Sequence, residues 1–198
     1  EGFITALRNE QTSRPFGDEV LTRAMARANS ALWEAGQSNP TLKGLSSTLT
    51  ALVLSDGQAR AVHVGDARLY RFTAGALACL TTDHNMATEL AETDAAKARG
   101  LQRWLSRALG FAAQVKADFV ETQVRPGDIF VLATDGLAKS LSDASTVHVL
   151  ERMSRRSARE ICDELIRVAT AEPVDDDLTI CVVKAVNRNT SSQNEREP

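Results

Sequence analysis

The segment 125–143 reads RPGDIFVLATDGLAKSLSD and contains the pattern on which both the fold and the site depend. Within it, Ile129 to Ala133 is a short apolar run, and Asp135-Gly136 follows almost directly. An apolar run of this length bounded by turn residues predicts a buried strand. A carboxylate delivered by a rigid strand to the start of a loop is well placed to hold a metal ion. The segment therefore predicts a strand that ends at a metal-ligating Asp135.

A second acidic cluster precedes the last apolar run of the chain. Asp175, Asp176 and Asp177 stand directly before LTICVV, and residues 178–185 are predicted to form a strand. Carboxylates packed together without partners raise one another's pKa and cost stability, whereas Mg²⁺ or Mn²⁺ offsets that cost through oxygen ligation. Two acidic strand ends on one scaffold therefore favour a site for a hard divalent cation. The alternative is that aspartate-rich turns only solvate the ends of strands.

The remaining patterns predict an α+β domain. Apolar residues recur at helical spacing from Asp18 to Gly36, and Ser157 with Glu160 forms a capping box that opens a helix ending near Thr170. Tight turns separate the predicted strands. Residues 47–55 pair with 58–65 across Asp56-Gly57, and a second hairpin folds about residues 73–75. Residues 115–124 pair with 129–134 across the turn at 125–128. Antiparallel hairpins surrounded by amphipathic helices are typical of an α+β fold.

Composition restricts the classes of function. A net charge of -3 over 198 residues gives no broad basic field, so no nucleic-acid partner is expected. No apolar run approaches the roughly 20 residues that span a bilayer, and the opening residues lack the pattern of a signal peptide. Cys79, Cys162 and Cys181 are odd in number and lie in apolar surroundings, which predicts buried free thiols in a reducing compartment. We therefore expect a cytoplasmic protein with no membrane partner.

Four further segments occur in a characteristic order. They are SSTLTALVL at 46–54, HVGDARLY at 63–70, LTTDH at 80–84 and LSRALG at 105–110. Together with the two aspartate segments, they resemble the metal-dependent serine/threonine phosphatases of the protein phosphatase 2C (PPM) family. The resemblance implies two packed antiparallel β-sheets flanked by helices, an αββα sandwich. It also implies two Mn²⁺ or Mg²⁺ ions, with a third and weaker one, in a cleft between the sheets.

The resemblance implies hydrolysis of phosphoserine and phosphothreonine on proteins. A metal-activated water attacks phosphorus without a covalent phosphoenzyme, so no catalytic residues beyond the metal ligands and no other cofactor site are expected. By position, the metal ligands are Asp135, Asp176 and Asp66, and Asp175 replaces Asp176 if the register shifts by one residue. Asp66 lies in the GDAR turn, where the alternative is a carboxylate that caps backbone N–H groups. The implied partners are phosphorylated proteins, with a serine/threonine kinase or its substrates.

Histidines are not assigned to the chemistry. His84 follows Asp83 in the family's Asp-His element beside the flap, and a structural role is favoured over that of a general acid. His63 lies inside a predicted strand and is expected to pack, while His148 is expected in a helix, either on its surface or partly buried. Residues 85–103 are rich in Ala, Glu, Asp and Lys and predict a solvated helix at the position of a short flap.

The sequence departs from the family before Gly44. There we find no phosphate-binding arginine and no Asp-Gly segment whose aspartate bridges both metals. We therefore expect an N-terminally incomplete domain over 1–186 with its N-terminal strands missing, a disordered tail over 187–198, and no two-metal centre assembled by this chain alone. The favoured explanation is a fragment of an active enzyme. The alternatives are a segment supplied by another chain and a catalytically inactive pseudophosphatase that acts as a regulatory protein-binding module.

Overall fold

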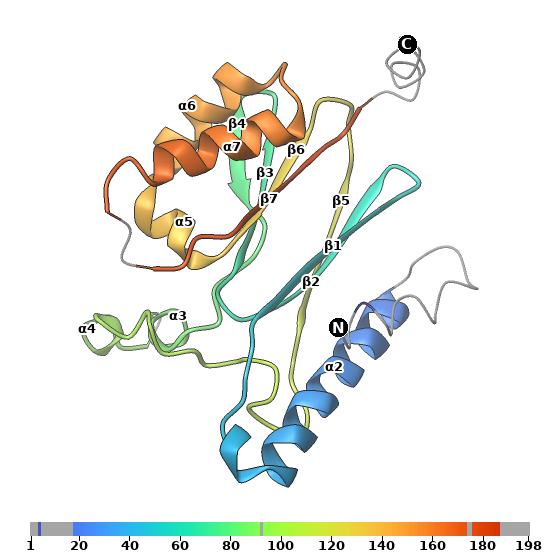
Figure 1. The fold of residues 1–198 in the computed structure, drawn as a ribbon, viewed down its shortest axis with the longest axis vertical. Helices are drawn as coiled ribbons and strands as arrows, with labels where there is room; N and C mark the ends of the chain where they lie inside the picture. Colours follow the sequence, from blue (N-terminus) through green and yellow to red (C-terminus); the bar gives the residue numbers. More distant parts are fainter. Residues whose placement is uncertain (1–3, 5–17, 92, 174–175, 187–198) are drawn as a thin grey trace. The chain divides into compact units, whose positions relative to one another are not determined.

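The computed structural model describes residues 4, 18–91, 93–173 and 176–186, and the chain divides into two compact units (Figure 1). Unit 1 contains Glu1–Ala67 and Thr81–Thr122, and unit 2 contains Arg68–Leu80 and Gln123–Pro198. Each unit is therefore built from segments that are distant in the sequence. Each also has its own β-sheet and its own apolar core.

The sheet of unit 1 has the strand order β1-β2-β5, with β1 at Leu49–Ser55, β2 at Gln58–Val64 and β5 at Asp118–Gln123. Strands β1 and β2 form the predicted antiparallel hairpin, and the register runs to the pair Ser55 and Gln58. Asp56 and Gly57 both have positive φ, at 51° and 75°. This is the backbone conformation that a two-residue hairpin turn requires.

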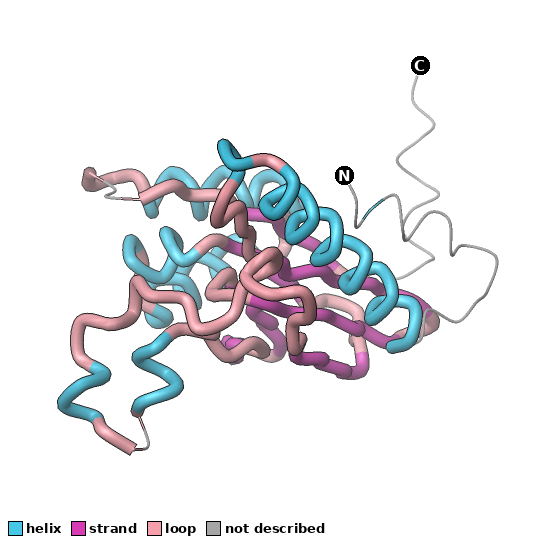
Figure 2. Tube along the Cα trace, turned by 90° about the horizontal axis from the view of Figure 1, so that it is seen from below, coloured by secondary structure: helices cyan, strands magenta, loops and turns pink. Residues whose placement is uncertain are grey.

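Helix α2, at Asp18–Ser38, covers the sheet of unit 1 (Figure 2). Its described part runs from Asp18, where the described residues resume, and carries the acidic side chains of Asp18 and Glu19 in the first described turn. It ends two residues beyond the predicted Gly36. The core that it closes is apolar throughout and consists of Leu21, Met25, Ala28, Val62, Val64 and Leu109.

The sheet of unit 2 has the strand order β4-β3-β6-β7, with β3 at Arg68–Thr73, β4 at Ala76–Cys79, β6 at Ile129–Ala133 and β7 at Ile180–Lys184. All three strand pairs are antiparallel. The strand predicted from the apolar run at 129–133 is confirmed, and most of its residues are buried because it lies between two neighbouring strands.

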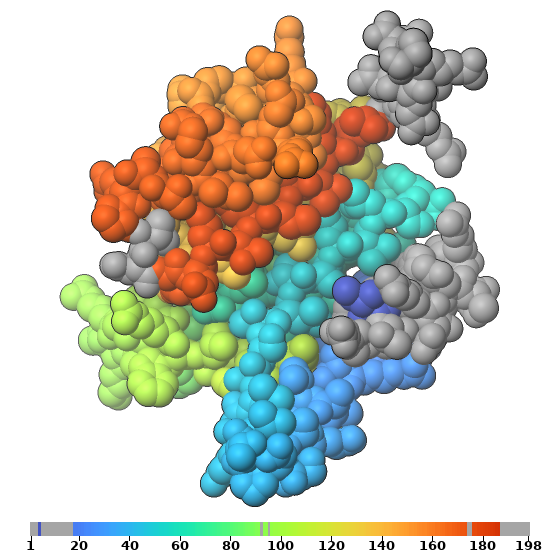
Figure 3. All heavy atoms as spheres, in the orientation of Figure 1, coloured from blue at the N-terminus to red at the C-terminus, as the bar shows by residue number. Residues whose placement is uncertain are grey.

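The described part of unit 2 contains helices α5 at Asp135–Ser140, α6 at Asp143–Met153 and α7 at Ala158–Ala169. The surfaces of α6 and α7 form the orange face of unit 2 in Figure 3. Helix α7 begins with the predicted capping box, in which the Ser157 hydroxyl accepts from the Glu160 amide and the Glu160 carboxylate accepts from the Ser157 amide. The buried face of α7 includes Ile161 and Leu165, which join the core formed with the sheet.

One predicted strand pairing is wrong. Strand β5 belongs to the sheet of unit 1 and β6 to that of unit 2, so the turn at 125–128 does not close a hairpin. Its backbone bonds show why: the Gly127 amide donates to the Ala185 carbonyl, and the Ala185 amide donates to the Asp128 carbonyl. The residues after the turn therefore pair with the end of β7.

Two other expectations are corrected. The three cysteines are free, as predicted, but Cys79 and Cys181 are exposed and Cys162 is partly buried, because the apolar strands and helix that carry them each have a solvent-facing side. The single helix expected over 85–103 is replaced by two short ones, α3 at Met86–Leu90 and α4 at Ala95–Ala98. Asn85 and Asp94 each cap one of them, so a second helix starts where the first has ended.

The structure confirms an α+β fold with two antiparallel sheets and flanking helices. Helix α6 carries His148 on its exposed side, as expected. A short 3₁₀ turn, η1 at Pro40–Leu42, follows α2. The expected tail at 187–198, Asp175 and most of the residues before Asp18 lie outside the described part of the chain. Among the described residues, no helix is both long and apolar enough to span a membrane.

Candidate metal centre

Asp135 stands where β6 ends and α5 begins. The sequence placed it at the start of a loop, but it is the first residue of a short helix. The preceding Thr134 ties this strand end to the segment before β7: its hydroxyl donates to the Asp177 carbonyl at 2.9 Å and accepts from the Thr179 amide at 3.0 Å. The Thr134 amide also donates to the Thr179 carbonyl. The two acidic segments that the sequence singled out are therefore held together by hydrogen bonds.

Gly136 permits this close approach. A Cβ atom at that position would lie 2.6 Å from the Asp177 carbonyl oxygen, which is closer than real Cβ contacts occur. Any larger residue would have to push the segment before β7 away. A glycine is therefore required after Asp135 for packing. Its lack of a side chain allows the backbone of the second acidic segment to lie against the first turn of α5.

Lys139 links the two predicted ligands in unit 2. Its Nζ lies 2.5 Å from Asp135 Oδ2 and also donates to Asp176 Oδ2. These hydrogen bonds, which the ammonium donates to Asp135 and to Asp176, raise the pKa of Lys139, and the one to Asp135 is the larger cause. The Asp177 amide donates to Asp176 Oδ1 at 2.8 Å, which leaves Oδ2 for the ammonium group. The two carboxylates therefore converge on one cationic group.

The donor set fits a hard divalent cation in kind. Two carboxylate oxygens already share one cation, the ammonium of Lys139, and Mg²⁺ and Mn²⁺ take carboxylate oxygens as ligands. The set is incomplete, because nowhere in 18–91, 93–173 or 176–186 do three His, Cys, Asp or Glu side chains gather as a metal site. The described residues thus bring together two of the carboxylates that the sequence predicted as ligands, and their role as metal ligands stays a prediction.

Asp66, the third predicted ligand, belongs to unit 1. It is partly buried in the bend after β2. The preceding Gly65 is anchored to His84 twice: its amide donates to His84 Nδ1 at 3.1 Å, and its carbonyl accepts from the His84 amide at 2.7 Å. Gly65 has φ of 113°, and a Cβ there would meet Thr48 at 2.4 Å. The bend that carries Asp66 is therefore rigidly held, while its role as a ligand stays a prediction.

His84 has the structural role that was expected. Because a backbone N–H can only donate, Nδ1 accepts from Gly65, so Nε2 carries the proton and donates to Asp118 at 3.1 Å. Burial alone would raise the pKa of Asp118, but hydrogen bonds from Arg107 and His84 lower it. The His84 ring is buried and its hydrogen-bonding positions are both used.

His63 packs beside His84, with 4.7 Å between ring centroids. Its Nε2 donates to the Thr82 carbonyl, and its Nδ1 lies 2.9 Å from the Thr50 hydroxyl. Burial, followed by the electrostatic interaction with His84, lowers the pKa of His63 to about 4. His63 is thus a packing residue, as predicted.

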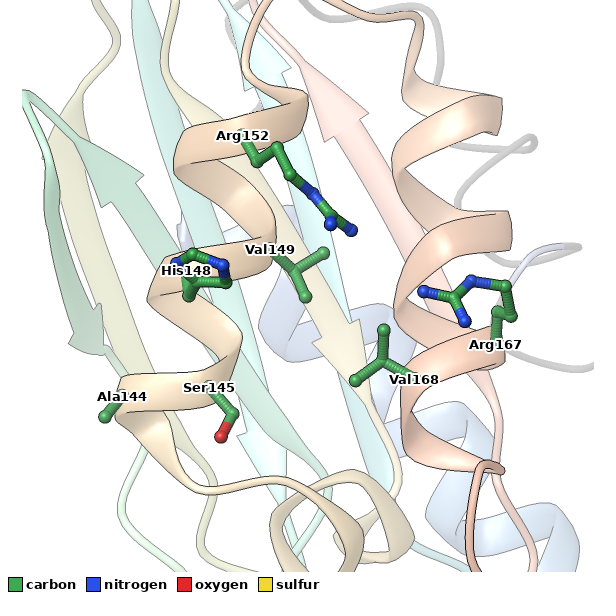
Figure 4. Close-up of a pocket in the computed structure, with 7 residues that line it drawn as sticks. All are labelled: Ala144, Ser145, His148, Val149, Arg152, Arg167 and Val168. Carbon is green, nitrogen blue, oxygen red and sulfur yellow. The ribbon is translucent and has the colours of Figure 1, made fainter.

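A separate groove lies between α6 and α7 (Figure 4). Arg152 and Arg167 come from opposite helices, and both pair with Glu164. The lining of this groove contains none of the predicted metal ligands. It consists of Ala144, Ser145, His148, Val149, Arg152, Arg167 and Val168. This groove is therefore distinct from the pair of carboxylates at the start of α5.

Lys139 is the residue that sequence reasoning missed. A signal was present, because Lys139 follows Asp135 by four residues, the spacing at which side chains meet on a helix. The sequence predicts a strand followed by a loop at Asp135, and in a loop a spacing of four residues does not indicate a contact. The contact between Lys139 and Asp176 joins residues 37 apart and has no local sequence signal.

Comparison with known proteins identifies the family. A family model for protein phosphatase 2C matches residues 2–178. The serine/threonine protein phosphatase PstP of Mycobacterium tuberculosis is 28% identical over 191 residues, which are 93% of this chain and 36% of PstP. A putative protein phosphatase 2C-type protein of Streptococcus pyogenes is 29% identical over 193 residues, covering 92% of this chain and 77% of that protein.

A solved structure agrees with the sequence comparison. The catalytic domain of PstP in complex with two manganese ions superposes with a TM-score of 0.80 at 27% identity, covering 93% of this chain and 79% of that one. The chain belongs to the protein phosphatase 2C family. It spans about a third of the length of PstP, at 36%.

Proposed function

We propose that this chain belongs to a protein that hydrolyses phosphoserine and phosphothreonine on other proteins with the help of Mn²⁺ or Mg²⁺. The observation that carries the proposal is the convergence of Asp135 and Asp176 on one cation. This convergence places two carboxylate oxygens around one cationic centre, which is the arrangement that a hard divalent ion also requires. The family and the two manganese ions of the PstP catalytic domain support the same assignment.

The proposed roles of the residues are simple. Asp135 and Asp176 would hold metal, with Asp66 as a ligand of a third, weaker ion. Divalent ions held there would supply an activated water and stabilise the negative charge that develops on the phosphoryl oxygens. Thr134 and Gly136 are positioning residues, because they fix the end of β6 against the segment that carries Asp176. The partners are phosphorylated proteins, with a kinase or its substrates, and we propose a cytoplasmic location.

A binding module without catalysis is the second candidate. It is favoured by the ammonium group of Lys139, which already compensates Asp135 and Asp176. On that reading, the aspartates hold α5 against the segment before β7, and the scaffold docks phosphoproteins or a kinase without hydrolysis. The two candidates differ in whether the carboxylates are needed for Mn²⁺-dependent chemistry.

The deciding experiment is Mn²⁺-dependent hydrolysis of a phosphothreonine peptide by the chain joined to an N-terminal segment that carries the family's missing motifs, with EDTA as the metal-free arm. Asp135→Asn should reduce activity at least 100-fold, about 2.7 kcal/mol of transition-state stabilisation, since it removes a charged ligand with little change of shape. Asp143→Asn is the matched control, because Asp143 also opens a helix but lies outside the cluster. Activity that survives EDTA and Asp135→Asn would refute the proposal. Mn²⁺ binding without hydrolysis, even with the N-terminal segment added back, would favour the binding module.

A further inference from the structure

We propose that Lys139 is a resident counterion that competes with the divalent metal for Asp135 and Asp176, and so sets the Mn²⁺ concentration at which the site fills. This inference rests on the proposed function, since it concerns the same carboxylates. Its basis is that the Lys139 ammonium takes Oδ2 of both aspartates, which are the atoms that a metal ion would need.

The position of Lys139 makes the competition intrinsic to the fold. It lies one helical turn after Asp135 on α5, so the helix itself returns its side chain to the carboxylate at the helix start. The second contact, to Asp176, depends on the hydrogen bonds of Thr134 that hold the segment before β7 in place. The two carboxylates that bind the ammonium of Lys139 are thus the same two that are predicted to bind the metal ion.

The side chain can also leave. Lys139 is 43% exposed, and a lysine has a flexible stem with a strongly hydrated head, so the ammonium can exchange the carboxylates for water. A buried lysine would block the metal permanently, whereas this one only raises the concentration required. Metal entry is then an exchange in which the ammonium returns to solvent and the divalent ion takes its oxygens.

Charge determines the direction of the effect. The two carboxylates carry two negative charges, and the ammonium cancels one of them. A divalent ion bound while the ammonium stays nearby meets a repulsive charge, and at roughly 5 Å in water-like surroundings this repulsion amounts to about a tenfold change in affinity. Removing the charge at position 139 should therefore tighten metal binding, although it also removes two ion pairs from the metal-free protein.

The test is calorimetric titration of Mn²⁺ into the full chain, with no substrate present. Lys139→Gln and Lys139→Met should each lower the dissociation constant about tenfold, while Lys139→Arg should change it little because the charge stays. Lys97→Gln is the matched control, since Lys97 also pairs with an aspartate of its own helix start, at 2.8 Å from Asp94. A melting curve for each variant confirms that it is folded.

Each outcome is decisive. Tighter binding in both neutral variants, absent in Lys97→Gln and lost again on adding Asp176→Asn, supports the inference. Equal or weaker Mn²⁺ binding in the neutral variants overturns it while leaving the proposed function intact. If neither the wild-type chain nor Lys139→Gln binds Mn²⁺, the inference is overturned, whereas the proposed function is decided by phosphopeptide hydrolysis with the N-terminal segment added back.

Discussion

At the scale of single residues, pairs of a carboxylate with a cationic side chain serve two different purposes in this chain. Asp128 is 2% exposed and accepts from the guanidinium of Arg71 at 2.6 Å and from the Arg125 amide at 2.9 Å. Burial alone would raise the pKa of Asp128, but hydrogen bonds from Thr73, Arg125 and Arg71 hold it below its ordinary value. This carboxylate is fully satisfied by the protein, so it is structural, whereas Asp135 and Asp176 share a displaceable cation.

The contrast between buried and exposed ion pairs gives a first prediction. Asp128→Asn should lower the free energy of unfolding by about 2 kcal/mol, since it leaves the Arg71 guanidinium largely buried without its counter-charge. Glu121→Gln breaks a comparable pair with Arg60, but Glu121 is half exposed, so the loss should stay below about 1 kcal/mol. Urea unfolding of both variants measures the difference. Equal losses would show that the Arg71 pair gains nothing from burial.

At the scale of elements, the sequence predicted most helices and strands but not all of their partners. Helix α7 is defined by a local signal, the Ser157 capping box, and its start was predicted to the residue. The partner of β6 is not a local property: the turn at 125–128 has hairpin chemistry, yet Gly127 and Asp128 bond to Ala185. The strand itself could be read from its apolar run, but its neighbours could only be read from the structure.

The candidate site shows the same division. Asp135 and Asp176 could be predicted because acidic residues at strand ends have a recognisable pattern, and the structure brings these two together. The link between them through Lys139 depends on a contact across 37 residues, which no local pattern records. The exposure of Cys79 and Cys181 was missed for a related reason, since an apolar strand does not reveal which of its faces is covered.

Strand β2 carries a group that makes the stability of unit 1 depend on pH. His63 is buried, and its pKa falls from 6.5 to about 4 in the folded chain. The unfolded chain therefore binds a proton between these values that the folded chain does not, so acidification through this interval favours unfolding. Stability should be fully present above pH 6.5 and fall towards pH 4, by at most roughly 1.4 kcal/mol per pH unit.

Urea unfolding at several pH values from 7 down to about 4.5 measures how the free energy of unfolding changes with pH. Within this range, paired carboxylates with lowered pKa stay ionised in the folded chain. His63→Gln should flatten the slope, since an amide can donate to the Thr82 carbonyl without titrating. His148→Gln, at an exposed position on α6, is the control and should leave the slope unchanged. An unaltered slope in His63→Gln would remove His63 as its source.

At the scale of the whole molecule, the division into two units means that metal binding need not stabilise the chain uniformly. Asp135 and Asp176 lie in unit 2, and the predicted third ligand, Asp66, lies in unit 1. A ligand that binds only the folded state stabilises it by mass action, by about 2.7 kcal/mol at 100 times its dissociation constant. Amides that exchange only through openings that release the metal should then exchange up to about 100-fold more slowly.

Hydrogen exchange measured with and without Mn²⁺ therefore reports separately on how far metal binding stabilises each unit. We expect slower exchange in 129–140 and 176–184, because Asp135 and Asp176 are attached to β6, α5 and β7 of one sheet and its core. Asp176→Asn should abolish this protection. Exchange at Gly65 and Asp66 tests the third ligand on its own: slower exchange with Mn²⁺ supports its assignment, and unchanged exchange means that Asp66 only shapes its turn. Protection absent from unit 2 would instead show that the converging carboxylates serve the ion pair with Lys139 alone.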